Sequence, residues 1–326
     1  MNTTIRKFFL KFLINSTIKD VAEKLKTTEG VGEGIIHRRI ATDADWDRTK
    51  ITRIGIDEIA LRKGHSHYLT IVSDISSLNN TKILAVIDGR TVDDIRPFLE
   101  SIPPRILQNL EGISIDMSAG YYSALKELFK NIPEKFDEIV VIDRFHVAKL
   151  LGDKIDGERK KSIKALKEEY KDDETTLKEL KSTMWPFRHH PENLDDAETD
   201  RLKKLFEYSP NLKKCHALRE ELYTIFEEKN ITKADAREKI DQWCIDTEEY
   251  ETKGYNPFKA FVKTYRKFEE HILNYFTHRI SSGAVEGLNN KIKVIKRRGF
   301  GFRNVLNFTK RLFLDINYRS VFMPSK

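Results

Sequence analysis

The order of strand and helix patterns between residues 51 and 145 constrains the fold more than any other feature. Three β-rich runs come first: ITRIGIDEIAL, HYLTIVSDI and KILAVIDG. A helix pattern (91–102), a strand pattern (111–118), a second helix (119–131) and a further strand pattern (137–145) follow. Short links make the first three strands an antiparallel meander, whereas helical crossovers return the later strands in parallel. We therefore expect an α/β fold with a mixed sheet over 51–150.

Residues 147–278 are charged, helix-patterned and almost without strand signals. Polar breaks divide them at KDDETT, HHPENLDD and KNITKAD. One helical face is marked by apolar spacing at Leu212, Cys215, Leu218, Leu222, Ile225 and Phe226. We expect an all-helical insertion over 151–278, after which closing helices over 279–326, beginning near Ser282, complete the sheet domain.

Residues 1–50 are mostly helix-patterned. The spacing of Ile18, Val21 and Leu25 is helical, TTEGVGEG interrupts it, and IIHRRI resumes it. A helix, a glycine-containing turn and a short basic helix are typical of a helix-turn-helix DNA-binding unit. Many αα-hairpins that serve only packing have the same pattern. We expect a helix-turn-helix-like segment, with both roles open.

The composition excludes several classes of protein. No apolar run approaches the length of a membrane span. The only cysteines are Cys215 and Cys244, so neither a disulfide framework nor a four-cysteine zinc site is available. Lys11 interrupts the apolar run near the N-terminus and no small-residue cleavage site follows, which argues against a signal peptide. We expect a cytoplasmic protein without membrane contact.

Positive charge is confined to one end of the chain. Residues 287–326 hold ten Lys/Arg and one acid, a balance of +9. Since the whole chain carries +7, the other 286 residues together carry −2. Local basicity of this kind is the footprint of a polyanion site. We expect phosphate contacts from Lys291, Lys293, Lys296, Arg297, Arg298 and Arg303.

Three of the expected strands end where an apolar run meets an aspartate, at Asp57, Asp116 and Asp143. The carboxyl ends of parallel strands meet at one edge of a sheet, where ligands usually bind. A fourth acid, Glu286, precedes the basic run and would repel the polyanion that the run attracts. A divalent cation resolves this conflict, because carboxylates hold hard cations and these hold phosphates. The pattern predicts a metal-dependent enzyme acting on DNA. Glu58 should point to the opposite face of its strand.

Four motifs resemble the signatures of bacterial insertion-sequence DDE transposases of the ISL3 type: GIDEIALRKGH (55–65), SIDMSAGY (114–121), DRFHVAK (143–149) and SGAVEGLNNKIKVIKRRGFGFRN (282–304). The resemblance is close over 51–160 and 279–318 and loose between them. It implies an RNase-H-like domain interrupted by the helical insertion. It also implies cleavage of DNA at the ends of a mobile element and transfer of the 3′-hydroxyl into target DNA.

The same resemblance implies that Asp57, Asp116 and Glu286 form a catalytic, metal-binding triad. The implied cofactor is Mg²⁺ or Mn²⁺, as two ions that clamp an in-line phosphoryl displacement. The implied partners are double-stranded DNA, at the element ends and at the target, and further copies of this chain, since two ends must be brought together. While bound to DNA the protein would be associated with the nucleoid.

The second metal ligand stays open between Asp116 and Asp143. We prefer Asp116 because its strand should lie next to the one that carries Asp57. Asp143 and His146 form the Asp-x-x-His motif of several transposase groups, and would support the site or contact DNA. An orienting hydrogen bond in the core is an equal alternative for His146. We expect Trp185 to be a core residue, with stacking on an unpaired base as the alternative.

Many relatives carry a cysteine-rich zinc-binding region before the helix-turn-helix. This chain has no cysteine before Cys215, so we expect that region to be missing and recognition of the element ends to be affected. Two other interpretations remain. One is a catalytically inactive or truncated transposase remnant that binds DNA, and the other is a structure-selective nuclease of the same fold.

Overall fold

The computed structural model describes residues 3–44, 46, 50–61, 67–77, 80–250, 255–280, 283–302 and 304–323. The chain divides into two compact units. Unit 1 comprises Met1–Val141 and Ile280–Lys326, and unit 2 comprises Ile142–Arg279. Among the described residues, no helix is both long and apolar enough to cross a membrane.

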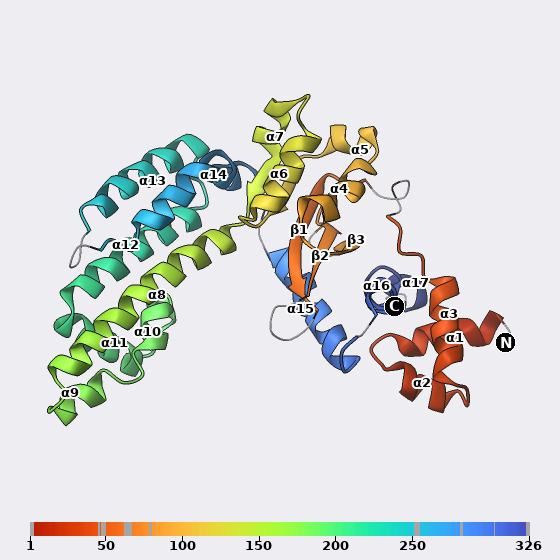
Figure 1. The fold of residues 1–326 in the computed structure, drawn as a ribbon, viewed down its shortest axis with the longest axis horizontal. Coiled ribbons are helices and arrows are strands. Elements are labelled where there is room, and N and C mark those ends of the chain that lie inside the picture. The colour runs from red at the N-terminus through yellow and green to blue at the C-terminus, as the bar shows by residue number, and fades with distance from the viewer. Residues whose placement is uncertain are drawn as a thin grey trace. The chain divides into compact units, whose positions relative to one another are not determined.

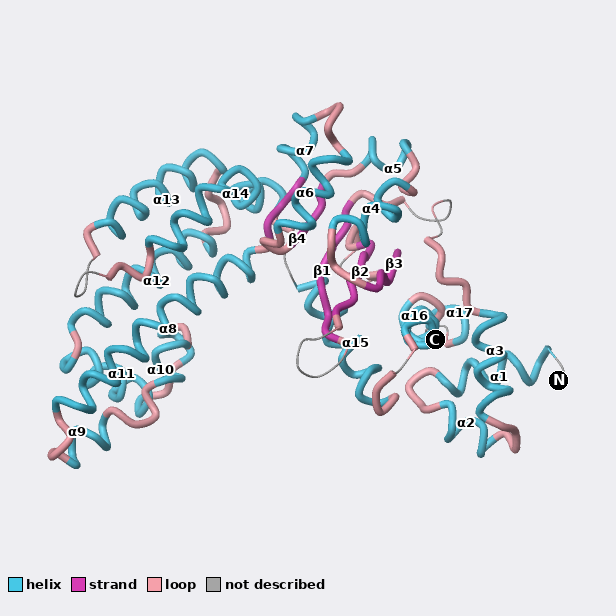
Figure 2. Tube along the Cα trace, viewed as in Figure 1, coloured by secondary structure: helices cyan, strands magenta, loops and turns pink. Residues whose placement is uncertain are grey.

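Unit 1 is built on a five-stranded sheet with the strand order β3-β2-β1-β4-β5 (Figures 1 and 2). The strands are β1 (Arg53–Ala60), β2 (Tyr68–Asp74), β3 (Lys82–Asp88), β4 (Gly112–Ile115) and β5 (Val140–Ile142). β2 pairs antiparallel with both β1 and β3, whereas β4 pairs parallel with β1. The expected mixed α/β sheet is confirmed, because short links leave only antiparallel pairing to the first three strands.

Two helices separate β3 from β4, and two separate β4 from β5: α4 (Val92–Glu100), α5 (Pro104–Asn109), α6 (Ala119–Leu128) and α7 (Pro133–Ile139). Thr91 and Asp94 form a capping box that starts α4. The strand expected over 137–145 was wrong in its first part. Pro133 occupies the first turn of α7, where its fixed φ favours a helix, and α7 buries Phe136 and Ile139. Only Val140–Ile142 remain as a strand.

The N-terminal helices share one apolar core with the sheet and the C-terminal helices. They are α1 (Thr3–Leu13), α2 (Ile18–Lys24) and α3 (Glu29–Arg39), and their C-terminal partners are α15 (Gly283–Arg298) and α16 (Val305–Ile316), with α17 (Arg319–Phe322) at the end. The interruption expected at TTEGVGEG was wrong for most of its length, because α3 begins at Glu29, after the N-cap Thr28, and includes all three of its glycines. This core includes Phe9, Leu13, Ile36, Leu69, Ile83, Leu288, Phe308 and Leu312. Ile292, Ile295, Phe313 and Ile316 of the basic C-terminal segment therefore pack inside the protein, whereas Val294 and Leu306 are exposed.

A buried ion pair ties α16 to the N-terminal helices. The Arg311 guanidinium donates to the backbone carbonyl oxygens of Leu13, at 2.7 Å, and Ser16, at 2.5 Å. It also pairs with the Asp315 carboxylate, which accepts a hydrogen bond from Asn15 N at 3.0 Å. Arg311 and Asp315 are each 6% exposed. Both charges are thus satisfied in the interior, as a buried pair requires.

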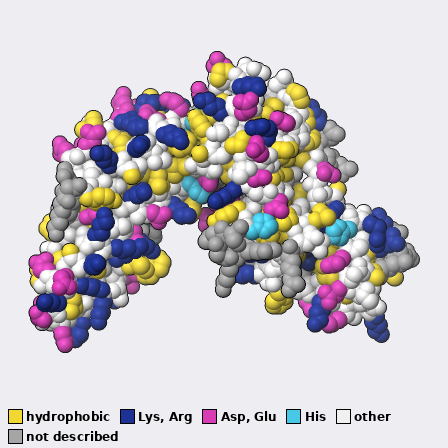
Figure 3. Space-filling view, in the orientation of Figure 1, with side chains coloured by type: hydrophobic (Ala, Val, Ile, Leu, Met, Phe, Trp, Pro, Cys, Tyr) yellow, Lys and Arg dark blue, Asp and Glu magenta, His cyan; other side chains and the backbone are white. Residues whose placement is uncertain are grey.

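Unit 2 is built of helices, which are α8 (Arg144–Glu169), α9 (Glu174–Glu179), α10 (Met184–Arg188), the 3₁₀ turn η1 (Pro191–Asn193), α11 (Asp196–Tyr208), α12 (Pro210–Glu227), α13 (Lys233–Glu248) and α14 (Lys259–His278). The expected helices and their polar breaks are confirmed. The apolar face predicted from Leu212 to Phe226 is buried along α12. On the visible face of this unit, acidic and basic side chains lie among one another (Figure 3).

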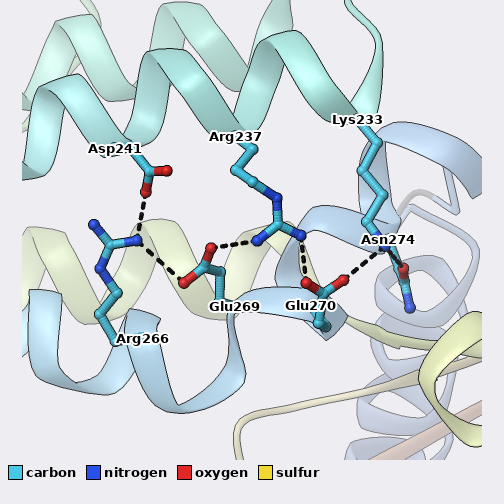
Figure 4. Close-up of polar contacts among 7 residues, drawn as sticks. All are labelled: Lys233, Arg237, Asp241, Arg266, Glu269, Glu270 and Asn274. Carbon is cyan, nitrogen blue, oxygen red and sulfur yellow. Dashed lines mark hydrogen bonds and ion pairs between the residues drawn. The ribbon is translucent and has the colours of Figure 1, made fainter.

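Charged residues alternate along the contact between α13 and α14, which we name the α13–α14 seam (Figure 4). Its members are Lys233, Arg237, Asp241, Arg266, Glu269 and Glu270. Glu269 accepts from Arg237 at 2.5 Å and from Arg266 at 3.1 Å. Lys233 lies 3.1 Å from Glu270, Arg237 also pairs with Glu270, and Arg266 also pairs with Asp241. Every cation of the seam therefore has a carboxylate partner.

Candidate functional site

A close contact between β1 and α15 places the candidate acids. A Cβ atom built on Gly55 would lie 2.8 Å from Val285 Cγ2, so a side chain here would force the helix and the strand apart. Side chains alternate along a strand, so Asp57 shares the face of Gly55, toward α15. The Asn289 amide of α15 donates to Asp57 Oδ2 at 2.5 Å. The glycine thus permits the approach that joins Asp57 to α15.

The strand register aligns Asp57 with Asp116. Gly55 pairs with Ser114 in the parallel ladder of β1 and β4, and each aspartate lies two residues farther along its chain. Asp57 and Asp116 therefore each follow the last pair of this ladder by two positions, on neighbouring segments. Asp116 directly follows β4, and its Oδ1 accepts a hydrogen bond from Ser118 N at 2.8 Å.

The expectation that Asp57 ends its strand was wrong. β1 continues to Ala60 because it still pairs with β2 there, in a ladder that runs from Ile54 to Ala60. The expectation for Glu58 was correct. It points to the other face, where it pairs with Arg90 at 3.2 Å.

A buried tyrosine lies within electrostatic reach of these acids. The Tyr121 hydroxyl of α6 is 2.9 Å from the Thr70 hydroxyl, and Tyr121 is fully buried. Burial raises the pKa of the Tyr121 phenol well above its ordinary value, and the negative charges of Asp116, Glu58 and Asp57 raise it further. The phenol therefore stays protonated and neutral beside several carboxylates.

Glu286 lies in the first turn of α15 and is exposed. It stands one position after Val285, which meets Gly55, and three before Asn289, which holds Asp57. The described residues contain no group of three or more His, Cys, Asp or Glu side chains arranged to hold a metal ion. The donor chemistry nevertheless suits a hard cation, because carboxylate and amide oxygens are its usual ligands. Asn289 Oδ1 is buried and has no hydrogen-bond partner within the described structure.

Asp143 and His146 lie at the start of α8. The Asp143 carboxylate caps this helix by accepting from Phe145 N at 3.0 Å, and Asp143 is 7% exposed. His146 Nε2 is 4.0 Å from Asp143 Oδ2, which is too long for a hydrogen bond. This geometry gives Asp143 a structural task at the end of β5.

The expected phosphate contacts separate into two groups. Lys293 and Arg297 are exposed and lie on the same side of α15 as Glu286 and Asn290, at helical spacing; we name these four residues the outward face of α15. Lys291 is also exposed. In contrast, Lys296 donates to Ala60 O at 2.7 Å, and Arg298 contacts Asn15 Oδ1 at 3.3 Å and Asp315 at 3.8 Å. Arg303 lies outside the described residues.

Sequence reasoning missed Asn289 and Tyr121 and misjudged one tryptophan. Asn289 is three residues from Glu286, and Tyr121 falls inside the motif that contains Asp116, but only the fold brings either of them to the acids. Trp185 was expected in the core. It is 55% exposed, and its indole ring lies 5.6 Å from the His189 ring.

Comparison with known proteins identifies the family of the chain. A family model for transposases of the ISL3 type matches residues 54–312. The transposase for insertion sequence element IS1001 of Bordetella parapertussis is 30% identical over 268 residues, which cover 82% of this chain and 61% of that protein. The transposase for insertion sequence element IS1557 of Mycobacterium tuberculosis is 23% identical over 291 residues, covering 83% of this chain and 62% of that protein.

This chain thus spans about three fifths of the length of these two relatives. A Lactococcus lactis protein named ATP-dependent protease is 30% identical over 118 residues, only 36% of this chain, and carries no argument about function. No solved structure matches the chain. Because the family model covers most of the sequence, from the first strand of the sheet to α16, the chain belongs to the ISL3-type family of transposases.

Proposed function

We propose that unit 1 carries the catalytic centre of a transposase that cuts DNA at the ends of an insertion sequence and joins the 3′-hydroxyl to target DNA. Asp57, Asp116 and Glu286 are the proposed catalytic acids. The contact between β1 and α15 carries this proposal, because Asn289 binds Asp57 one helical turn from Glu286. The parallel register of β1 and β4 supports Asp116 as the second acid.

The same three carboxylates are the proposed ligands of two divalent cations, Mg²⁺ or Mn²⁺. Such cations supply Lewis acidity and activate an attacking water or hydroxyl group at neutral pH. The chain's own part is to hold the acids. Asn289 fixes one oxygen of Asp57, and the Glu58 backbone N–H, at 2.7 Å, fixes the other. Tyr121, neutral and buried, fills the space beside them without adding charge.

The outward face of α15 is the proposed docking surface for DNA. Lys293 and Arg297 are exposed there, and their charges can neutralise phosphates next to the acid on the same face. They would position the duplex without reading its sequence. Lys296 and Arg298 are better explained as contacts that hold α15 in place, since each binds a backbone or side-chain oxygen inside unit 1.

Three further features belong to this proposal. The pair α2 and α3, with Thr28 capping α3, serves as a helix-turn-helix whose exposed Arg38 and Arg39 face DNA. The helices of unit 2 form an insertion within an RNase-H-like domain. The active form is an oligomer of this chain on DNA, because two element ends take part in one reaction.

One assay tests the catalytic proposal. The protein is incubated with Mg²⁺, a target plasmid and labelled duplexes that carry the terminal sequences of its element. We expect Glu286→Gln to keep its fold and DNA binding, because Glu286 is exposed, and to lose both strand breakage and joining. Glu100→Gln makes the same chemical change at the exposed end of α4 and should keep all activities.

The other outcomes separate the alternatives. Breakage without joined products in the wild-type protein would indicate a structure-selective nuclease. DNA binding without breakage would indicate a non-catalytic DNA-binding protein. Calorimetric titration with Mn²⁺ in the absence of DNA tests the ligands independently: Asp57→Asn should weaken metal binding, and equal heats for this variant and the wild type would contradict the assignment.

A further inference from the structure

The turn that ends α15 has an unusual residue at its left-handed position. Phe300 N donates to Arg297 O at 3.0 Å, and Gly301 N donates to Lys296 O at 3.2 Å. This pair of hydrogen bonds is the Schellman motif, in which the residue after the C-cap takes a left-handed conformation and is usually glycine. Here that residue is Phe300, with φ +51°, although Gly299 and Gly301 flank it. The backbone therefore bears strain that a glycine would remove.

Packing does not explain this strain. Phe300 is 93% exposed, which exceeds every other large hydrophobic residue in the described chain; the next, Val321, is 66% exposed. In contrast, Phe302, two residues later, packs against the core, since its ring lies 4.9 Å from the ring of buried Phe308. A strained backbone that presents an unburied aromatic ring points to a role outside the folded chain.

The surroundings of Phe300 favour a nucleic acid as the occupant. Arg297, on the outward face of α15, lies one turn before the ring and Lys293 lies two turns before it. A cavity lies between α2, α3 and this turn. Its volume of about 880 Å³ falls in the size range of small-ligand sites. Its lining includes the acids Asp20, Glu23, Glu29 and Glu33 together with the cations Lys19, Arg298 and Arg311. The acids repel phosphate, so the backbone of a strand would stay beside Lys293 and Arg297 of α15 and offer a neutral base to the ring.

We propose that Phe300 is a stacking residue that receives an unpaired base of DNA beside the cations of α15. A base inside a paired duplex has both faces covered by its neighbours, so the ligand is a base at a single-stranded tail or an opened end. Stacking on an aromatic side chain tolerates any base. This inference rests on the proposed function of α15 as the DNA-docking surface, and adds what that surface does with a strand that is no longer paired.

The test compares two DNAs and matched variants of the full chain. One DNA is a fully paired duplex, and the other is the same duplex with a short 3′ tail that carries 2-aminopurine at its first unpaired position. Phe300→Ala should weaken binding to the tailed DNA roughly 5- to 150-fold and abolish the change in 2-aminopurine fluorescence. Binding to the paired duplex should stay within about twofold, because phosphate contacts supply it.

Further variants separate stacking from folding. Phe300→Tyr keeps an aromatic face and should retain tight binding to the tailed DNA. Phe300→Gly should raise the melting temperature while binding the tail as weakly as Phe300→Ala, because it removes both the strain and the ring. Leu306→Ala, which truncates an apolar residue of α16 that is 49% exposed, and Trp185→Ala, at the exposed indole of α10, should bind both DNAs like the wild type.

Several results would overturn the inference. These are equal affinity of the wild type and Phe300→Ala for the tailed DNA, an equal loss for both DNAs, or a loss confined to Trp185→Ala. Dissociation of an oligomer by Phe300→Ala in light scattering would instead make the occupant a second copy of the chain. If the wild type binds neither DNA, the DNA-docking role of α15 fails as well, whereas wild-type binding that does not depend on Phe300 overturns this inference alone.

Discussion

The α13–α14 seam and the outward face of α15 both contain cations, but the surroundings of these cations differ. In the seam, Arg237 and Arg266 each contact two carboxylates (Figure 4). On α15, Lys293 and Arg297 are exposed, and the nearest acid on the same face, Glu286, precedes them by seven and eleven positions. The charges of the seam pair with one another across two helices, whereas the cations on the outward face of α15 are exposed, as the proposed contact with DNA requires. Local charge density alone does not distinguish these uses.

The largest effect on stability is expected at Arg311, the cation of the basic C-terminal segment that forms a buried ion pair. Arg311→Met leaves the buried Asp315 carboxylate without its closest cationic partner, since Arg298 is 3.8 Å away, and should lower the free energy of unfolding of unit 1 by about 3–5 kcal/mol. Urea unfolding measures the loss, and hydrogen exchange should locate it in α1–α3, whose carbonyls Arg311 binds. The double variant Arg311→Met with Asp315→Leu should recover most of the stability. If the single variant is as stable as the wild type, the paired cations of this segment are not structural.

Next in size is the effect of removing the exposed cations on the outward face of α15. Lys293→Ala with Arg297→Ala should leave the melting temperature unchanged and reduce the slope of log affinity for DNA against log salt by roughly 1.8, since each neutralised phosphate contributes about 0.9. At 0.1 M salt the affinity should fall on the order of 50-fold. As the matched control, Arg237→Ala with Arg266→Ala removes the same charge from the seam. Equal slopes for both double variants would mean that only net charge matters.

The smallest effect belongs to an individual pair in the seam. The side chains of Arg237 and Glu269 are 34% and 19% exposed, so water screens their attraction. A double-mutant cycle with Arg237→Ala and Glu269→Ala should give a coupling free energy of about 0.2–1 kcal/mol that shrinks as salt is added. DNA affinity should not change in any of these variants. A coupling that is large and insensitive to salt would show that the seam is effectively buried and would weaken the comparison.

The sequence predicted the architecture because local patterns determine it. Alternation and short links were enough for the three antiparallel strands, and apolar spacing was enough for α12. Asp57 and Asp116 were predicted to come together, and the β1–β4 register agrees with that expectation. The end of β1 was predicted at Asp57 but lies at Ala60, because β1 stays paired with β2 as far as Ala60 although its pairing with β4 ends at Gly55. Pattern reasoning on β1 alone cannot reveal where two neighbouring strands stop.

Contacts between distant parts of the chain were beyond prediction. Lys296 was assigned to DNA, but it binds a carbonyl 236 residues away, and Arg298 binds a side chain 283 residues away. No spacing rule links such positions. Asn289 was missed for the same reason, since its partner Asp57 is 232 residues away. No turn was predicted at residues 299–301, and although the two glycines there favour the left-handed conformation, only the backbone identifies Phe300 as the residue that takes it at the end of α15.

The bond between Arg311 and the backbone of Leu13 also sets an order of events during synthesis. The two residues are 298 positions apart, so a ribosome adding 5–20 residues per second needs roughly 15–60 s to make the second after the first. Unit 2 is continuous in sequence and can complete its own packing within that interval. The core that contains Phe9 and Leu13 cannot be completed before then, because Phe308 and Leu312, which belong to the same core, emerge after unit 2 is finished. Through most of translation the growing chain therefore carries an apolar surface on its N-terminal helices that the C-terminal helices do not yet cover. Unit 1, which unit 2 interrupts in the sequence, completes its folding last.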